Sequence, residues 1–85
     1  MNTFTFARHH SGTWTMECND TILVQGSLRE VDALASRLSR ALLLPRAEFE
    51  AFRRTAGIKS HPIFGDSYPG EPAKVDAEAW SRIVD

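Results

Sequence analysis

The stretch TWTMECNDTILVQGSLRE, residues 13–30, decides the fold because the spacing of its apolar residues changes partway along. Over residues 13–18 apolar and polar residues alternate, which is the pattern of a half-buried β-strand. Residues 21–25 are β-branched and more continuously apolar, and they predict a second strand. Asn19 and Asp20 lie between the two strands and tolerate the left-handed backbone of a tight turn. The stretch therefore begins as an antiparallel hairpin.

The same stretch ends at the start of a helix. Ser27 precedes Glu30 by three residues, which is the reciprocal capping-box spacing of a helix N-terminus. After Ser27, apolar residues recur every three or four positions, so they share one face of a long helix. They are Leu28, Val31, Leu34, Ala35, Leu38 and Leu42, whereas Arg29, Asp32, Ser36 and Arg40 fall elsewhere. Pro45 interrupts this helix, because a proline in a helix interior removes a hydrogen bond and clashes with the preceding turn.

A further strand precedes the hairpin. Residues 3–8 alternate polar and aromatic side chains, and Ser11-Gly12 suits the tight turn that joins this strand to the next. The three strands are expected to form an antiparallel meander in chain order. Residues large enough to fill the core between the sheet and the helices are Phe4, Phe6, Trp14, Phe49, Phe52 and Trp80.

After Pro45 the chain predicts shorter elements. Residues 46–56 indicate a second helix that ends at Gly57, a residue suited to the left-handed position after a helix. Residues 61–72, HPIFGDSYPGEP, combine prolines and glycines with large apolar residues, which favours an ordered strap over a flexible linker. Asp76 is a suitable N-cap for a short terminal helix. The predicted fold class is α+β: a three-stranded antiparallel β-meander with one face covered by a long helix, plus a second short helix, a Pro/Gly-rich strap and a C-terminal short helix.

Length and composition limit the classes of protein to consider. The 85 residues are 42% hydrophobic and 25% charged, which fits a single small globular domain over residues 1–85. No apolar stretch reaches the roughly 18 residues that span a bilayer, and the N-terminus lacks the pattern of a signal peptide, so we expect no membrane partner. The single cysteine, Cys18, excludes an intramolecular disulfide and fits a reducing, cytoplasmic environment.

Residues that carry chemistry are few. The three histidines and Cys18 lack the ligand spacings of a zinc site, and no glycine-rich phosphate motif is present, so we expect no metal and no cofactor. His61, Asp66 and Ser67 are close enough in sequence for a hydrolase-like site, which stays a third hypothesis. Ordinary turn chemistry also places polar residues there, and so short a chain leaves little room for a substrate cavity. We therefore predict that the protein is not an enzyme.

A basic segment offers nucleic acid as an alternative partner. Residues 28–59 carry seven basic residues against four acidic ones, although the net charge of the whole chain is −1. Four of the basic residues lie within 46–59 and could contact the phosphates of DNA or RNA. They are Arg46, Arg53, Arg54 and Lys59. Against this regulatory DNA/RNA-binding hypothesis, Glu48 and Glu50 lie on the same helix, and a bare proline break is shorter than the turn of a helix-turn-helix motif.

Contact with a protein partner is the function that the sequence favours. A three-stranded meander leaves two edges that can pair with another chain, and a thin core is a reason for a small protein to form a homodimer. Phe64 and Tyr68 join the four basic residues as candidate contact residues, because aromatic residues and arginine are enriched at interface anchors. In size and layout, though in no sequence motif, the chain resembles small accessory proteins of phages and mobile elements, including anti-CRISPR inhibitors. The resemblance implies an inhibitor or accessory protein that acts only by binding.

Overall fold

The computed structural model describes residues 2–71, 78 and 81–82. The chain divides into two compact units, Met1–Phe52 and Arg53–Asp85. The first unit contains a three-stranded sheet and the second a two-stranded hairpin. A single domain over residues 1–85 stays a prediction. The C-terminal helix stays one too, because Asp76, Trp80 and the last three residues lie outside the described part of the chain.

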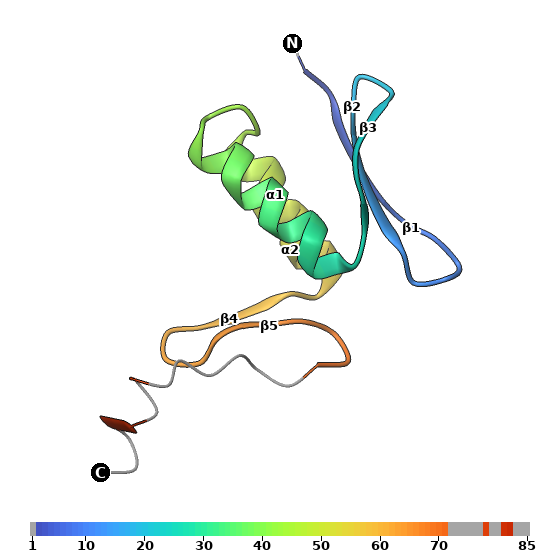
Figure 1. Cartoon of the computed structure of the whole chain (residues 1–85). Coiled ribbons are helices and arrows are strands. Elements are labelled where there is room, and N and C mark those ends of the chain that lie inside the picture. Colours follow the sequence, from blue (N-terminus) through green and yellow to red (C-terminus); the bar gives the residue numbers. More distant parts are fainter. Residues whose placement is uncertain (1, 72–77, 79–80, 83–85) are drawn as a thin grey trace. The chain divides into compact units, whose positions relative to one another are not determined.

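The sheet of the first unit is the antiparallel meander that the sequence predicts. Its strands are β1 (Phe4–Arg8), β2 (Trp14–Cys18) and β3 (Thr21–Gly26), in the order β1-β2-β3 shown in Figure 1. Phe6 pairs with Met16, and Arg8 pairs with Trp14, so the aromatic side chains of β1 and the apolar side chains of β2 share one face. Met16 lies fully buried on that face.

Residues with positive φ lie in both connections of the sheet. Asn19 and Asp20 have φ values of 52° and 69°, which are the two positive values of a type I′ turn and confirm the prediction for this pair. Gly12 has a φ of 84° in the loop between β1 and β2, where any residue with a side chain would be strained. Between β2 and β3 the register shifts, and Leu23 is the additional residue of a β-bulge.

Helix α1 (Leu28–Arg40) begins where the sequence predicts. The Ser27 hydroxyl accepts a hydrogen bond of 3.2 Å from the backbone N–H of Glu30, as the N-cap of a capping box does. The Glu30 carboxylate folds back over Gly26, where a Cβ atom would collide with it. Glycine at this position therefore leaves room for a negative charge at the N-terminus of the helix, where the helix dipole favours it.

The buried face of α1 is rotated from the predicted stripe. Asp32 was expected outside that stripe, yet it is buried together with Val31 and Ala35. Leu34 and Leu38 are only half-buried. The prediction for Asp32 was wrong because the buried face of α1 is centred on Val31, Asp32 and Ala35 and not on the middle of the predicted apolar stripe.

Helix α2 (Arg46–Ala56) starts directly after Pro45, as predicted. The ring of Phe52 stacks on Phe6, with centroids 4.1 Å apart, and meets Trp14 edge-on at 6.0 Å. Figure 1 shows α1 and α2 on the same side of the sheet, so two helices cover this face. The first unit is thus a small α+β arrangement of a sheet and a helical layer.

The connection between the helices differs from the prediction. Helix α1 ends at Arg40, and residues 41–45 are irregular. Leu42, predicted on the apolar stripe of α1, is 90% exposed and has a φ of 62°. That prediction was wrong because hydrogen bonds at the end of α1 turn the chain before the helical spacing reaches this residue. The connection is also longer than a bare proline break, so its length no longer argues against a helix-turn-helix motif.

The second unit contains the end of α2 and a hairpin that the sequence pattern does not predict. Gly57 follows α2 with a φ of 78°, which confirms its left-handed position. Strands β4 (Lys59–His61) and β5 (Gly65–Ser67) then pair antiparallel, so the hairpin begins two residues before the predicted strap of residues 61–72 and extends into it. Strands of three residues are too short for an alternating pattern to indicate them.

Candidate protein-contact surface

Two hydrogen bonds at the end of α1 shape the connection to α2. The N–H of Leu42 donates to the Ser39 carbonyl at 3.1 Å, and the N–H of Leu43 donates to the Leu38 carbonyl at 2.9 Å. This pair of bonds is the Schellman motif, which requires a left-handed residue directly after the cap. Leu42 holds that position, where glycine is the usual residue.

The leucines of this connection lie mostly in solvent. Leu42 is 90% exposed and Leu43 is 55% exposed, whereas Leu44 is fully buried. We call Leu42 and Leu43 the leucine turn. A left-handed backbone costs a residue with a side chain about 1–2 kcal/mol of folding stability. A leucine buried against other residues would offset this cost with about 2 kcal/mol of hydrophobic stabilisation, but Leu42 is exposed and contributes little of it. For folding alone, glycine would serve better than leucine at position 42.

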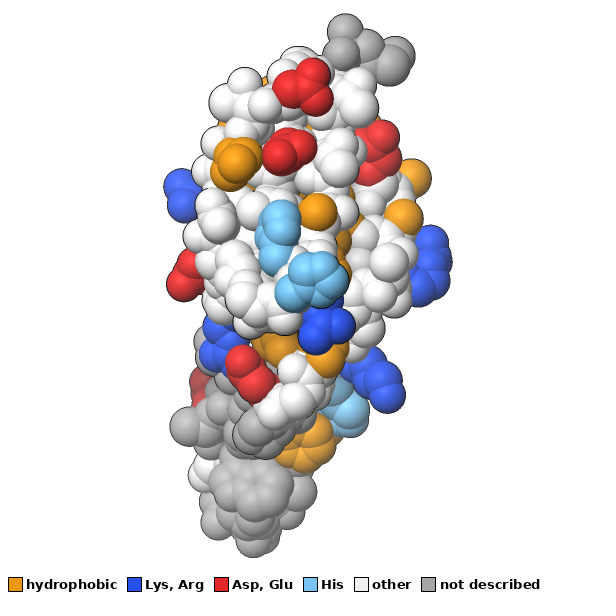
Figure 2. Space-filling view, turned by 90° about the vertical axis from the view of Figure 1, so that its right-hand side faces the viewer, with side chains coloured by type: hydrophobic (Ala, Val, Ile, Leu, Met, Phe, Trp, Pro, Cys, Tyr) orange, Lys and Arg blue, Asp and Glu red, His pale blue; other side chains and the backbone are white. Residues whose placement is uncertain are grey.

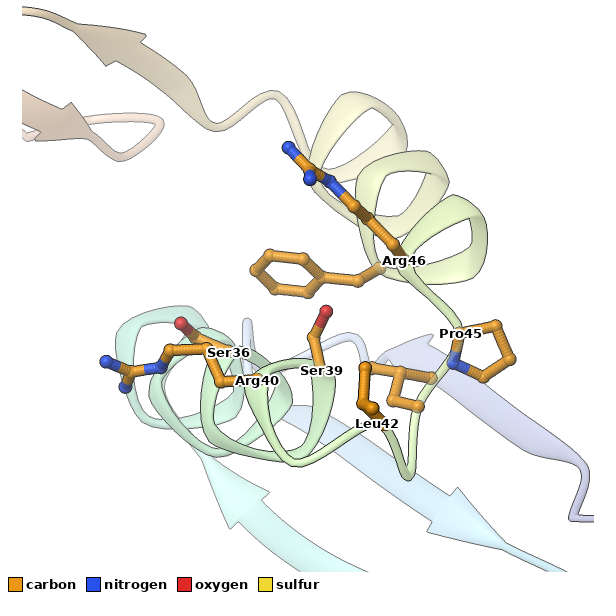
Figure 3. Close-up of a pocket in the computed structure, with 8 residues that line it drawn as sticks. Ser36, Ser39, Arg40, Leu42, Pro45 and Arg46 are labelled. Carbon is orange, nitrogen blue, oxygen red and sulfur yellow. The ribbon is translucent and has the colours of Figure 1, made fainter.

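A pocket of about 410 Å³ lies beside the leucine turn, between α1 and α2. Its lining residues are Ser36, Ser39, Arg40, Leu42, Leu44, Pro45, Arg46 and Phe49. Figure 3 shows the Ser39 hydroxyl directed into the space between the helices, with Arg40 projecting from α1 and Arg46 from α2. We call this cavity the helix pocket.

The helix pocket combines an apolar wall with basic side chains. Leu44, Pro45 and Phe49 supply the wall, and none of the eight lining residues is acidic. The Nε atom of Arg46 lies 3.0 Å from Oε1 of Glu50, but both side chains are largely exposed. An exposed pair of this spacing contributes only about 0.3–0.5 kcal/mol, so another carboxylate can replace it at little cost.

Arg53, one of the predicted contact residues, is engaged within the second unit. Its guanidinium donates to the Ser60 hydroxyl at 3.0 Å and forms an ion pair with Asp66 at 2.8 Å. Ser60 in turn donates to Asp66 at 2.9 Å. Burial raises the pKa of the Asp66 carboxyl, but the hydrogen bonds from Arg53 and Ser60 and the charge of Arg53 outweigh it, so the pKa lies below its usual value. These interactions join the end of α2 to the β4–β5 hairpin.

The other predicted contact residues differ in exposure. Arg54 and Lys59 are exposed, whereas Phe64 and Tyr68 are half-buried. The ring of Phe64 lies 4.7 Å from the imidazole of His61. The structure therefore places five of the six predicted residues in the second unit, with only two of them well exposed. The sixth is Arg46, which lines the helix pocket of the first unit.

Two of the three residues of the hydrolase-like hypothesis, His61 and Asp66, have separate structural contacts. Nδ1 of His61 accepts hydrogen bonds from the backbone N–H groups of Ile63 at 3.0 Å and Phe64 at 3.2 Å, which fixes the turn between β4 and β5. Asp66 is held by the guanidinium and hydroxyl partners described above. Both side chains therefore stabilise the hairpin in this arrangement.

A smaller polar pocket of about 290 Å³ lies at the β1–β2 loop and is lined by Arg8, His9 and His10. Nε2 of His9 lies 3.2 Å from the hydroxyl of the buried Thr15. Figure 2 shows histidine side chains beside a basic side chain on this face. Among the residues that the structure describes, no three histidine, cysteine, aspartate or glutamate side chains are grouped closely enough to hold a metal ion.

The leucine turn and the helix pocket are the features that sequence reasoning missed. A signal for them was present, because three consecutive leucines before Pro45 cannot all lie on one face of a helix. The absence of glycine or asparagine from residues 41–45 also separates this connection from an ordinary helix end.

In the described part of the chain, no helix has the length and apolar character needed to cross a membrane. No protein-family model, no curated protein and no solved structure matches this chain.

Proposed function

We propose that this chain is a non-enzymatic binding module that acts through protein–protein contact, with the leucine turn as its principal contact surface. One observation carries the proposal: Leu42 is 90% exposed in a left-handed backbone position. An exposed pair of adjacent leucines next to a partly apolar pocket is the type of surface that a partner covers. Leu42 makes the fold less stable than glycine would, and a role in binding a partner would explain why leucine is present there.

The finer proposal concerns the kind of module. A small protein that presents one apolar contact surface suits an inhibitor or accessory protein of the phage or mobile-element type, which works by covering part of a larger partner. The lone Cys18 is compatible with a reducing, cytoplasmic environment for this activity. Neither statement depends on a catalytic residue.

Nucleic acid is the second candidate partner, favoured by the exposure of Arg54 and Lys59 on the basic segment 46–59. Within the same segment Glu48 and Glu50 carry negative charges, which weaken the attraction of this segment for a polyanion. If this candidate is correct, Arg54→Glu combined with Lys59→Glu will abolish a gel shift of duplex DNA or RNA at ~50 mM salt. No shift of either nucleic acid by the unmodified protein at that salt concentration contradicts it.

The contact proposal is tested by comparing two variants with the unmodified protein. Leu42→Gly combined with Leu43→Ser removes the leucine turn and keeps the Schellman hydrogen bonds, because glycine suits the left-handed position. The matched control is Ile22→Thr, which removes a 54% exposed apolar side chain from β3 of the same unit. Each tagged protein is incubated with extract of its native host, and retained proteins are quantified by mass spectrometry.

We expect a discrete protein retained by the unmodified chain and by Ile22→Thr, and at least roughly tenfold less of it with the leucine-turn variant. Circular dichroism and thermal unfolding of all three proteins verify that the fold is intact. The proposal is contradicted if the leucine-turn variant retains as much partner as the unmodified protein. It is also contradicted if the unmodified protein is a monomer and retains no protein from the extract.

A further inference from the structure

We propose that the helix pocket receives an apolar side chain from an acidic segment of the partner protein, whose carboxylates pair with Arg40 and Arg46. This inference rests on the proposed function and names the chemistry of the partner.

The size and wall of the helix pocket suit an apolar side chain. Its volume of about 410 Å³ lies within the usual range of cavities that bind small apolar groups. Leu44, Pro45 and Phe49 line it, and Leu42 stands at its border with 90% of its surface exposed. A side chain inserted there would also cover Leu42, so one contact would desolvate both the pocket and part of the leucine turn.

Charge selects an acidic segment over a neutral or basic one. Arg40 and Arg46 both line the pocket, and none of the eight lining residues is acidic, although Arg46 also forms an exposed pair with Glu50. Guanidinium groups bind carboxylates through paired hydrogen bonds, which adds orientation as well as attraction.

Charge also argues against the other occupants of this surface. A second copy of the chain in a symmetric contact would bring its own Arg40 and Arg46 to the same place, and like charges would oppose each other. A nucleic acid would set its phosphates against Leu42 and Leu43, which offer them neither charge nor hydrogen bonds. An acidic segment with an apolar side chain can pair with Arg40 and Arg46 and can also cover the apolar wall and Leu42.

The experiment uses a display library of random twelve-residue peptides, selected against the full chain alone, and the enriched peptides are then compared on the full chain and on its Ser39→Phe variant. The new phenylalanine fills the helix pocket from a side chain that points into it. Enriched peptides are synthesised with a fluorescent label, and their dissociation constants are measured by anisotropy. A second variant, Arg40→Glu with Arg46→Glu, reverses the charge of the pocket, and Arg37→Glu is the control in the last turn of α1 outside the pocket lining.

We expect enriched peptides in which acidic residues flank an aromatic or aliphatic residue. Ser39→Phe and the double charge reversal should each weaken their binding at least roughly tenfold, whereas Arg37→Glu should weaken it less than about threefold. The effect of the double reversal should shrink in high salt, and that of Ser39→Phe should not.

The inference is overturned if no peptide is enriched, if the enriched peptides are basic or uncharged, or if they bind Ser39→Phe as tightly as the unmodified chain. Sedimentation that shows a dimer dispersed by Ser39→Phe would assign the pocket to a second copy and overturn it as well. The proposed function fails separately, because it depends on loss of the host partner from the Leu42→Gly, Leu43→Ser variant. If that loss occurs and no acidic peptide is enriched, the contact surface stands and the assignment of the pocket falls.

Discussion

The ends of α1 and α2 share the two hydrogen bonds of the Schellman motif and differ in their residues, and α1 has an additional bond of 3.2 Å from the N–H of Leu44 to the Leu38 carbonyl. At each end, one N–H donates to the carbonyl three residues before it and the next N–H to the carbonyl five residues before it. The left-handed position is Gly57 after α2 and Leu42 after α1. The following residue is Ile58, 8% exposed, after α2, and Leu43, 55% exposed, after α1.

The end of α2 has the residues that favour folding, whereas the end of α1 has residues that lower the stability of the fold. After α2, glycine removes the backbone strain, and the next residue, Ile58, is buried. After α1, the same motif forms with a strained residue, and the apolar side chains stay in solvent. Because the Schellman hydrogen bonds form at both ends, the two ends differ mainly in the backbone strain and the exposure of the residues that follow the helix.

The largest expected effect tests whether Phe52 of α2 stabilises the fold and Leu42 after α1 does not. Phe52→Ala should lower the free energy of unfolding by about 3–5 kcal/mol, because the ring stacks on Phe6 and is buried in the core of the first unit. Leu42→Ala should change it by less than about 0.5 kcal/mol, because this side chain covers almost nothing. Urea unfolding followed by circular dichroism measures both. Similar losses from the two variants would show that Leu42 packs in solution and would remove the basis of the comparison.

The second effect makes the end of α2 resemble the end of α1. Gly57→Ala should destabilise the protein by about 1–2 kcal/mol, because the new side chain occupies a backbone with a φ of 78°. Crowding adds little, since the Cβ atom would lie 3.4 Å from Cγ of Pro69. The control is Gly12→Ala, at a φ of 84° with open space around it, which isolates the backbone cost. A thermal midpoint for Gly57→Ala equal to that of the unmodified protein would contradict a strained left-handed position.

The third effect has the opposite sign and makes the end of α1 resemble the end of α2. Leu42→Gly should stabilise the protein by about 1 kcal/mol, because relief of backbone strain exceeds the loss of a nearly uncovered side chain. Thermal unfolding measures the gain, and Leu42→Ala separates it from mere removal of the leucine side chain, since alanine keeps the strain. A lower thermal midpoint for Leu42→Gly than for Leu42→Ala would show that the position does not require glycine.

Much of the first unit could be predicted because each element follows a local rule. Alternation indicates the strands, the Asn19-Asp20 pair indicates the I′ turn, and Ser27 with Glu30 indicates the start of α1. Gly57 indicates the end of α2 for the same reason, since its requirement for positive φ is local.

The remaining features depend on interactions that the sequence pattern does not express. Helical spacing continues through Leu42, so the pattern alone extends α1 past its actual end. The burial of Asp32 depends on which part of the apolar stripe meets the sheet, and the pairing of Arg53 with Asp66 depends on a hairpin with short strands. The helix pocket lies between two helices, and neither helix indicates it alone.

The smallest expected effect concerns the ion pair that joins the end of α2 to the β4–β5 hairpin. Asp66→Asn removes the carboxylate that Arg53 and Ser60 hold, and it should cost less than about 1 kcal/mol at neutral pH, because the Asp66 side chain is 41% exposed. The pKa of this carboxyl is lower in the folded protein than the usual 3.8. Its contribution to stability is therefore present above about pH 4 and is lost as the pH falls through the lowered pKa.

Urea midpoints of the unmodified protein and Asp66→Asn should therefore differ between pH 5 and 7 and converge toward pH 2, roughly in step with titration of the carboxyl. Glu50→Gln is the control at the other end of α2, because its pair with Arg46 is more exposed and should contribute only about 0.3–0.5 kcal/mol. A difference between the unmodified protein and Asp66→Asn that stays constant down to pH 2 would show that the carboxylate charge does not hold the hairpin. In that case the end of α2 would owe its stability to Gly57 and Ile58 alone, and the contrast with the leucine turn would rest on those two residues.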